Sequence, residues 1–141
     1  MEARLTERSD RDRARAALRL LLAALFAAAG VLHLAAPHPF LSITPAWVPF
    51  APAVVALTGL CELAGAAGLV TPRWRRPAAA LLAAYAVCVY PANVEHALLH
   101  AERGAPPGWW YHGPRLALQP VIIWACLFAG GLIDRPFGRR G

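Results

Sequence analysis

The chain has 141 residues, enough for one domain, of which 58% are hydrophobic and only 16% are charged. A soluble domain usually has about 45–50% apolar residues and about a quarter charged ones, so this composition excludes an ordinary soluble domain. The net charge of +6 comes from arginines beside apolar segments, and no lysine is present. Such a distribution argues against a nucleic-acid partner.

Residues 1–15 mix Arg with Asp and Glu and predict a solvated, disordered tail. The apolar segment at 16–36 is long enough to span a hydrocarbon core of about 30 Å. A signal peptide is the alternative interpretation of this segment. Three further apolar segments of similar length follow it, which favours a retained helix.

Residues 37–52 contain five prolines, a density that opposes a regular helix. Trp47, Phe40 and Phe50 indicate that this segment lies at the membrane–water interface. Pro91 is expected to break or kink the third apolar segment, and a Gly- and Pro-rich loop follows at 101–114. The expected membrane helices are 16–36, 53–70, 78–100 and 115–133.

The arginines predict the orientation of these helices. Twelve of the fourteen fall in the two tails, the start of the first helix or the turn at 71–77, against Arg103 and Arg115 on the other side. By the positive-inside rule both termini are cytoplasmic (N-in, C-in) and the number of helices is even. The predicted fold is therefore all-α: an integral membrane four-helix bundle at 16–133 between cytoplasmic tails at 1–15 and 134–141. The Arg- and Ala-rich composition is typical of a GC-rich bacterium, so we expect a multi-pass protein of the bacterial inner membrane.

Helix rise places several polar residues at a common depth. At about 1.5 Å per residue, His33, Asn93 and Gln119 fall in one layer of the outer leaflet, with Glu62 below them and Arg115 at the outer rim. Polar groups within a bilayer are costly and need an interior partner or a function. The candidate ligand-binding residues are His33, Glu62, Asn93, Gln119 and Arg115.

Glu62 is the only carboxyl group expected near mid-membrane. Exposed to lipid as a charge it would cost a few kcal/mol, so it should face the other helices, with His33 or Arg115 as its partner. Two interpretations stay open. Glu62 and His33 are a catalytic or ligand-anchoring pair, or they form a structural hydrogen bond between helices.

Other candidates are weaker. His96 and His100 stand at i, i+4, a spacing that can bind a metal, but a solvated helix end is the preferred interpretation and no metal is expected. His33 and His96 could ligate haem, but no other residue supports this and haem is not expected. His38 and His112 fall in loops without a clear partner. Cys61, Cys88 and Cys126 lie singly, which disfavours disulfide chemistry.

Five motifs resemble the DoxX-like family of small bacterial membrane proteins. They are Gly30–His33 with Phe40–Pro49, Thr58–Gly65, Pro72–Ala78, Pro91–Val94, and Arg115–Gln119 with Trp124. Their order and spacing cover residues 17–133. The resemblance implies a four-helix membrane bundle and links the wider group to quinone-dependent redox systems and, more distantly, to sterol isomerases.

Three functions follow as hypotheses. The first is an accessory or binding subunit that holds a quinone-like or other lipophilic molecule in the polar layer, beside membrane lipid and a membrane redox partner. The second is a membrane enzyme, of isomerase or cyclase type, with Glu62 as the acid or base and His33 as its partner. The third is a structural or chaperone-like bundle. The sequence leaves open whether the protein is an enzyme, what its cofactor is and whether it forms an oligomer.

Overall fold

The computed structural model describes residues 2–104, 106 and 108–134, and side chains from residue 9 onward. Over these residues every regular element is a helix, which confirms the all-α prediction. The helices are α1 (Glu2–Ala35), α2 (His38–Ser42), α3 (Ala51–Val70), α4 (Arg75–Glu102) and α5 (Trp109–Ala129).

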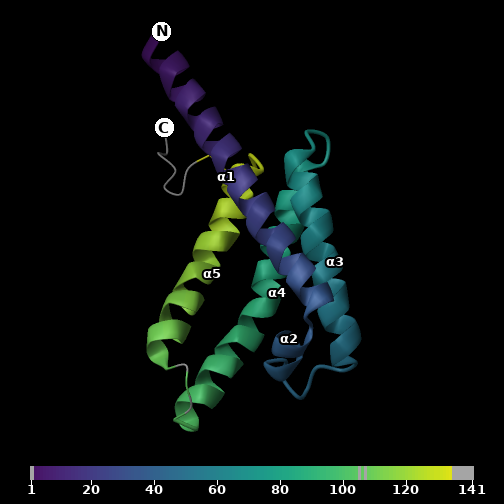
Figure 1. The fold of residues 1–141 in the computed structure, drawn as a ribbon. Coiled ribbons are helices and arrows are strands. Elements are labelled where there is room, and N and C mark those ends of the chain that lie inside the picture. The colour runs from purple at the N-terminus through teal and green to yellow at the C-terminus, as the bar shows by residue number, and fades with distance from the viewer. Residues whose placement is uncertain (1, 105, 107, 135–141) are drawn as a thin grey trace.

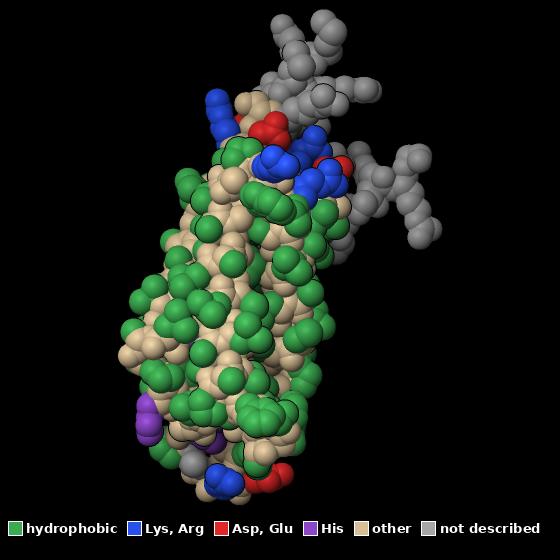
Figure 2. All heavy atoms as spheres, turned by 90° about the vertical axis from the view of Figure 1, so that its right-hand side faces the viewer, with side chains coloured by type: hydrophobic (Ala, Val, Ile, Leu, Met, Phe, Trp, Pro, Cys, Tyr) green, Lys and Arg blue, Asp and Glu red, His purple; other side chains and the backbone are tan. Residues whose placement is uncertain are grey.

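Three helices are long and apolar enough to cross a membrane, and they comprise Ser9–Ala35, Ala51–Val70 and Arg75–Glu102. Large apolar side chains on all four long helices face outward, among them Leu25, Leu57, Leu81 and Val121. On the face shown in Figure 2, apolar side chains are spread over the body of the molecule, and the charged ones gather at its two ends. A surface of this kind suits lipid and would be a liability in water.

The long helices pack in the order α1, α3, α4, α5, and α1 also contacts α5. Figure 1 shows the α3–α4 turn and the C-terminal end of α5 at one end of the molecule, with the N-terminal part of α1 projecting beyond them. Because Arg11, Arg15 and Arg19 of α1 and Arg73 of the α3–α4 turn lie here, we call this the arginine end. The opposite end carries α2 and the α4–α5 connection, and we call it the α2 end.

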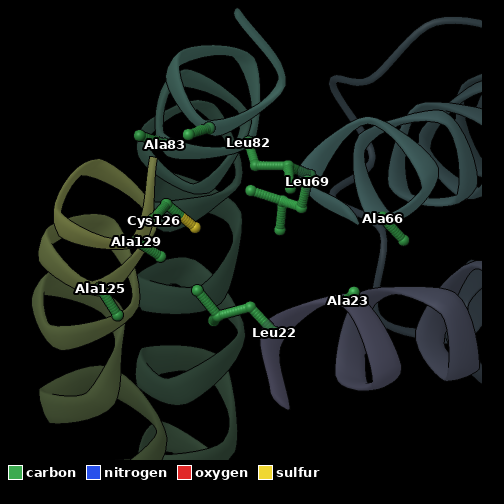
Figure 3. Close-up of a cluster of buried hydrophobic side chains, with 10 residues drawn as sticks. Leu22, Ala23, Ala66, Leu69, Leu82, Ala83, Ala125, Cys126 and Ala129 are labelled. Carbon is green, nitrogen blue, oxygen red and sulfur yellow. The ribbon is translucent and has the colours of Figure 1, made fainter. Parts of the chain in front are cut away.

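The main apolar core lies toward the arginine end (Figure 3). Leu22 of α1, Leu69 of α3, Leu82 of α4 and Cys126 of α5 are each at most 4% exposed and belong to one cluster. Small residues let the helices approach closely here, as Gly65 illustrates: a Cβ at that position would stand 2.5 Å from Leu82 Cδ2. The α2 end has no apolar cluster of this kind among the described residues.

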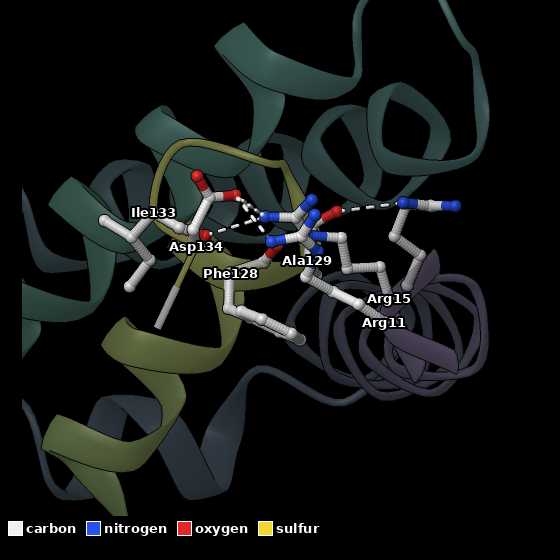
Figure 4. Close-up of polar contacts among 7 residues, drawn as sticks. Arg11, Arg15, Phe128, Ala129, Ile133 and Asp134 are labelled. Atoms are coloured by element: carbon white, nitrogen blue, oxygen red, sulfur yellow. Dashed lines mark hydrogen bonds and ion pairs between the residues drawn. The ribbon is translucent and has the colours of Figure 1, made fainter. Parts of the chain in front are cut away.

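Arginines of α1 bind the carboxyl end of α5 (Figure 4). Arg15 donates from Nε to the Phe128 carbonyl at 3.1 Å and from Nη2 to the Ile133 carbonyl at 2.9 Å, and Arg19 Nη1 donates to the Ala129 carbonyl at 3.0 Å. The last carbonyls of a helix have no partner within it, and a cation there is stabilised by the helix dipole.

These contacts correct the expectation of a disordered tail at 1–15. α1 is helical from Glu2, and the Arg15 side chain is only 13% exposed. The sequence shows no apolar face in this segment, so its attachment to α5 through arginine could not be read from hydropathy. The expected basic tail at 134–141, with Arg135, Arg139 and Arg140, lies outside the described residues except for Asp134.

Prolines interrupt the helices less than expected. Within 37–52 the chain forms the short α2, with proline at its start, where a missing N–H costs nothing. Phe50 then takes a left-handed conformation (φ 52°) before α3. α4 continues through Pro91 rather than breaking there, and α5 contains both Pro114 and Pro120.

Candidate functional site

Glu62 lies at the centre of a polar contact among α1, α3 and α4. Its side chain is buried on α3, with 4% of the residue exposed. Tyr85 of α4 donates its hydroxyl to Oε1 at 2.9 Å, and Nδ1 of His33 on α1 lies 2.9 Å from Oε2. The predicted pairing of Glu62 with His33 is therefore present in the structure.

The two oxygens of this carboxyl group differ. Nδ1 of His33 is also 2.9 Å from the Ala29 carbonyl, one turn back in α1, and the N–H direction favours that oxygen. Oε2 is therefore close to the imidazole but receives no aligned hydrogen bond from any described residue. Oε1 is satisfied by Tyr85, whereas Oε2 is buried and has capacity for another partner.

Glycines and an aromatic ring set the position of His33. A Cβ on Gly30 would stand 2.7 Å from the Gly59 carbonyl, and one on Gly59 would stand 2.8 Å from His33 Cβ. α1 and α3 therefore touch backbone to backbone at this level, which brings His33 over Glu62. Phe40 of α2 stacks on the imidazole with ring centroids 3.7 Å apart. This stack fixes the ring plane and limits where His33 can donate.

A second polar cluster joins α4 to α5. Arg115 donates from Nη2 to Asn93 Oδ1 at 2.5 Å, and Asn93 Nδ2 donates to Gln119 Oε1 at 3.5 Å, a long contact. Gln119 is buried and donates from Nε2 to the Ala86 carbonyl at 2.8 Å. The amide groups of Asn93 and Gln119 thus find their partners within the α4–α5 pair.

Three histidines continue this cluster toward the α2 end. His96 and His100 of α4 have their Nε2 atoms 3.2 Å apart, and Arg115 Nη1 lies 3.0 Å from Nδ1 of His96. His112 packs against both, with ring centroids 4.9 Å from His96 and 5.2 Å from His100. The expectation that His112 is a loop residue without a partner is wrong, because it lies in α5 and is 2% exposed.

The predicted polar layer therefore separates into two groups. His33 and Glu62 meet between α1 and α3, whereas Asn93, Gln119 and Arg115 meet between α4 and α5. Arg115, one of the two expected partners of Glu62, binds Asn93 and His96 instead. His38 lies on α2 and is exposed.

Tyr85 and His112 were not predicted from the sequence as site residues. The antiparallel helix pairs to which they belong provide a pattern that could have identified both. Glu62 precedes the α3–α4 turn by nearly as many residues as Tyr85 follows it. His100 precedes the end of α4 by nearly as many residues as His112 follows the start of α5. In two antiparallel helices joined by a short turn, residues at equal distances from the turn come to the same level.

A family model described as Domain of unknown function (DUF8561) matches residues 22–129. The match includes Glu62 with both its partners and all of the α4–α5 polar cluster. No match to a curated protein or to a solved structure was found.

Proposed function

The chain belongs to the DUF8561 family, and we propose that it is an integral protein of the bacterial inner membrane whose four long helices all span the bilayer. Arginines at one end of the molecule support cytoplasmic termini under the positive-inside rule. Exposed aromatic residues near the opposite end, Trp47, Trp109 and Trp110, suit the outer membrane–water interface.

The fourth span in this proposal is α5, which is not among the three helices that length and composition alone identify as candidate spans. Its polar side chains are those that contact α4: His112 and Gln119 are buried, and Arg115 binds Asn93. Leu118 and Val121 of α5 point outward. A polar residue in a membrane helix is tolerated when it faces another helix and finds a partner there.

We further propose that the protein is a binding subunit, which holds a lipophilic molecule with hydrogen-bonding oxygens against Glu62. The observation that carries this proposal is the unsatisfied Oε2 of a buried carboxyl group. Buried polar atoms are nearly always hydrogen-bonded, and an exception calls for a missing partner. Asn93 bonds to Gln119, and Gln119 bonds to the Ala86 carbonyl of α4, which favours a role for both in joining α4 to α5. The proposed ligand site is therefore limited to His33, Glu62 and Tyr85.

Quinones fit this site chemically. A protonated Glu62 donates from Oε2 to a quinone carbonyl, and an ionised Glu62 accepts from a quinol hydroxyl, so one group serves both redox forms. The apolar faces of α1 and α3 offer the isoprenoid tail a surface continuous with lipid. The DoxX-like resemblance supports a membrane redox partner for such a subunit.

The test is to identify what the protein carries. The full chain is purified in a mild detergent or in native nanodiscs, and bound small molecules are quantified by mass spectrometry against bulk lipid. We expect a quinone at up to one per chain, reduced about tenfold or more in Glu62→Leu, which removes both the donor and the acceptor at this position (tenfold corresponds to about 1.4 kcal/mol). Glu95→Leu is the matched control because Glu95 binds Trp47 and not this cluster.

A wild-type protein that carries only bulk lipid, or a Glu62→Leu variant that carries as much quinone as wild type, would contradict the binding proposal. If both carry nothing specific and Glu62→Leu changes only thermal stability, the structural-bundle hypothesis replaces it.

A second candidate is an enzyme that moves a proton on a lipophilic substrate. The observation in its favour is the 2.9 Å approach of His33 Nδ1 to Glu62 Oε2, the arrangement of an acid–base pair. Under this function Glu62→Gln retains the bound molecule but lowers its turnover by a factor of about 100 or more. Retained binding with lost turnover in Glu62→Gln favours the enzyme, and binding without turnover in wild type favours the binding subunit.

A further inference from the structure

The α2 end holds three imidazoles in mutual contact. His96 and His100 come from successive turns of α4, and His112 comes from the first turn of α5. One ring nitrogen of each can be chosen so that all three atoms lie within 4.8 Å of one another. Since the side chains belong to two helices joined by a short connection, the cluster depends on the packing of α4 against α5.

We propose that His96, His100 and His112 bind a divalent transition-metal ion such as Zn²⁺. Imidazole nitrogens are common ligands of such ions, and three of them with a fourth position left open is an established zinc arrangement. Two nitrogens that bind one tetrahedral zinc at about 2.0–2.1 Å lie about 3.3 Å apart. The Nε2 atoms of His96 and His100 already lie 3.2 Å apart, so the main adjustment is an approach of His112.

The surroundings leave room for a fourth ligand. A hollow of about 360 Å³ is lined by His100 and His112 together with Ala97, Gly104 and Trp109, among other residues. A water molecule or a small anion in this hollow would complete the coordination. The proposed site is thus distinct from the Glu62 cluster, and it does not depend on the quinone proposal.

The contact of Arg115 with His96 competes with metal binding at this site. Its Nη1 lies 3.0 Å from Nδ1 of His96, and a guanidinium can only donate, so Nδ1 must accept and the proton of a neutral ring sits on Nε2. A metal on Nε2 requires the other tautomer, with its proton on Nδ1, where a donor cannot stay. Metal binding and the Arg115–His96 contact therefore exclude each other.

Arg115 keeps a hydrogen-bond partner when His96 binds the metal. Its Nη2 donates to Asn93 Oδ1, so the side chain can keep this bond while it releases His96. Its positive charge also repels a dication nearby. The wild-type affinity for metal is therefore reduced by Arg115, and removal of the guanidinium should increase it. Histidines that merely form a polar helix end would give no such response.

The experiment titrates the full chain, purified without a polyhistidine tag, with Co²⁺, which reports tetrahedral coordination by its visible absorption. Zn²⁺ is then added to displace it. We expect about one ion per chain. His112→Ala should weaken binding by about 100-fold or more through loss of a ligand, and Arg115→Met should tighten it about tenfold. His38→Ala is the control because that histidine is exposed on α2.

Because His112 is buried, its substitution could unfold the protein, so His100→Ala is measured beside it, with thermal unfolding of each variant. The site is overturned if wild type binds neither Co²⁺ nor Zn²⁺, or if binding persists in both folded histidine variants. An Arg115→Met variant with unchanged or weaker affinity overturns the competition between Arg115 and the metal.

Discussion

The hydroxyl of Tyr85 donates to Oε1 of Glu62 at 2.9 Å and so ties α4 to α3. The two residues lie on either side of the α3–α4 turn. Glu62 is buried, and Tyr85 is partly buried. This bond satisfies one oxygen of the carboxyl group, whereas the other oxygen is buried and has no aligned hydrogen bond from a described residue. Stability and binding can therefore be separated at this site by choosing which residue to change.

We expect Tyr85→Phe to destabilise the protein by about 1 kcal/mol, the usual size of a hydrogen bond between membrane helices. The ring stays in place, so packing is preserved and only the donor is lost. The measurement is thermal or chemical unfolding in detergent, with Tyr90→Phe as the matched control because Tyr90 is 36% exposed on the same helix. Equal effects of the two variants would mean that the Tyr85 bond contributes nothing.

Arg15→Ala should lower the free energy of unfolding by about 1–3 kcal/mol, since it removes two hydrogen bonds to backbone carbonyls. The Phe128 carbonyl keeps its bond from the Gly131 N–H, whereas the Ile133 carbonyl loses its partner. The ion pair with Asp134 adds little, because that side chain is 73% exposed and screened by water. Arg15→Lys should recover only part of the lost stability, because an ammonium group cannot reproduce the two hydrogen bonds that the planar guanidinium donates to separate carbonyls.

The control for this prediction is Arg13→Ala. Arg13 is 82% exposed, and its one ion pair among the described residues is with Asp10 at 4.0 Å, so its loss should change stability by no more than about 0.5 kcal/mol. A cost for Arg13→Ala as large as that for Arg15→Ala would show that net charge, and not the attachment of α1 to α5, sets the stability.

Gly59→Ala should cost about 1–3 kcal/mol and also disturb ligand binding. The new methyl group would meet His33 Cβ at 2.8 Å and the Gly30 carbonyl at 3.0 Å, so α1 must move away from α3 and carry His33 with it. Unfolding and quinone content are measured together. Gly108→Ala is the control, since its nearest contact would be an ordinary 3.7 Å; a Gly59→Ala variant that behaves like it would contradict the close packing of α1 on α3.

Cysteine labelling tests the proposed four spans. In a background with Cys61, Cys88 and Cys126 changed to alanine, Arg103→Cys should react with an impermeant maleimide on intact cells. Arg73→Cys and Asp134→Cys should react only after the inner membrane is permeabilised. Labelling of Asp134→Cys on intact cells would mean that α5 does not cross, leaving the three spans that length and composition alone support.

The all-α fold could be predicted from the sequence because the chain consists of long apolar runs between prolines or arginines. The predicted helix boundaries were less accurate. α1 extends well before the predicted start at residue 16, and Arg15 in this extension binds the end of α5. α4 passes through Pro91 because a proline removes only one backbone hydrogen bond. Neither effect appears in hydropathy, since both depend on what lies beside the helix.

The candidate site was predicted in part. The depth of His33 and Glu62 led to their pairing, because helix rise converts position in the chain into height. Depth cannot say which way a side chain faces, so Asn93 and Gln119 were placed with Glu62 although they meet between other helices. Tyr85 and His112 were missed because an aromatic residue in an apolar run and a histidine near a loop carry no pattern of their own.

The uneven distribution of the core between the two ends has a consequence for how a guest molecule arrives. At the arginine end the helices pack through buried apolar side chains, which include Leu22, Leu69, Leu82 and Cys126. Toward the α2 end, polar contacts join the helices. Hydrogen bonds between helices can exchange for bonds to a ligand, and packed leucines cannot. In the proposed orientation the closely packed end faces the cytoplasm, so a lipid-soluble guest would approach Glu62 from the side of the outer leaflet.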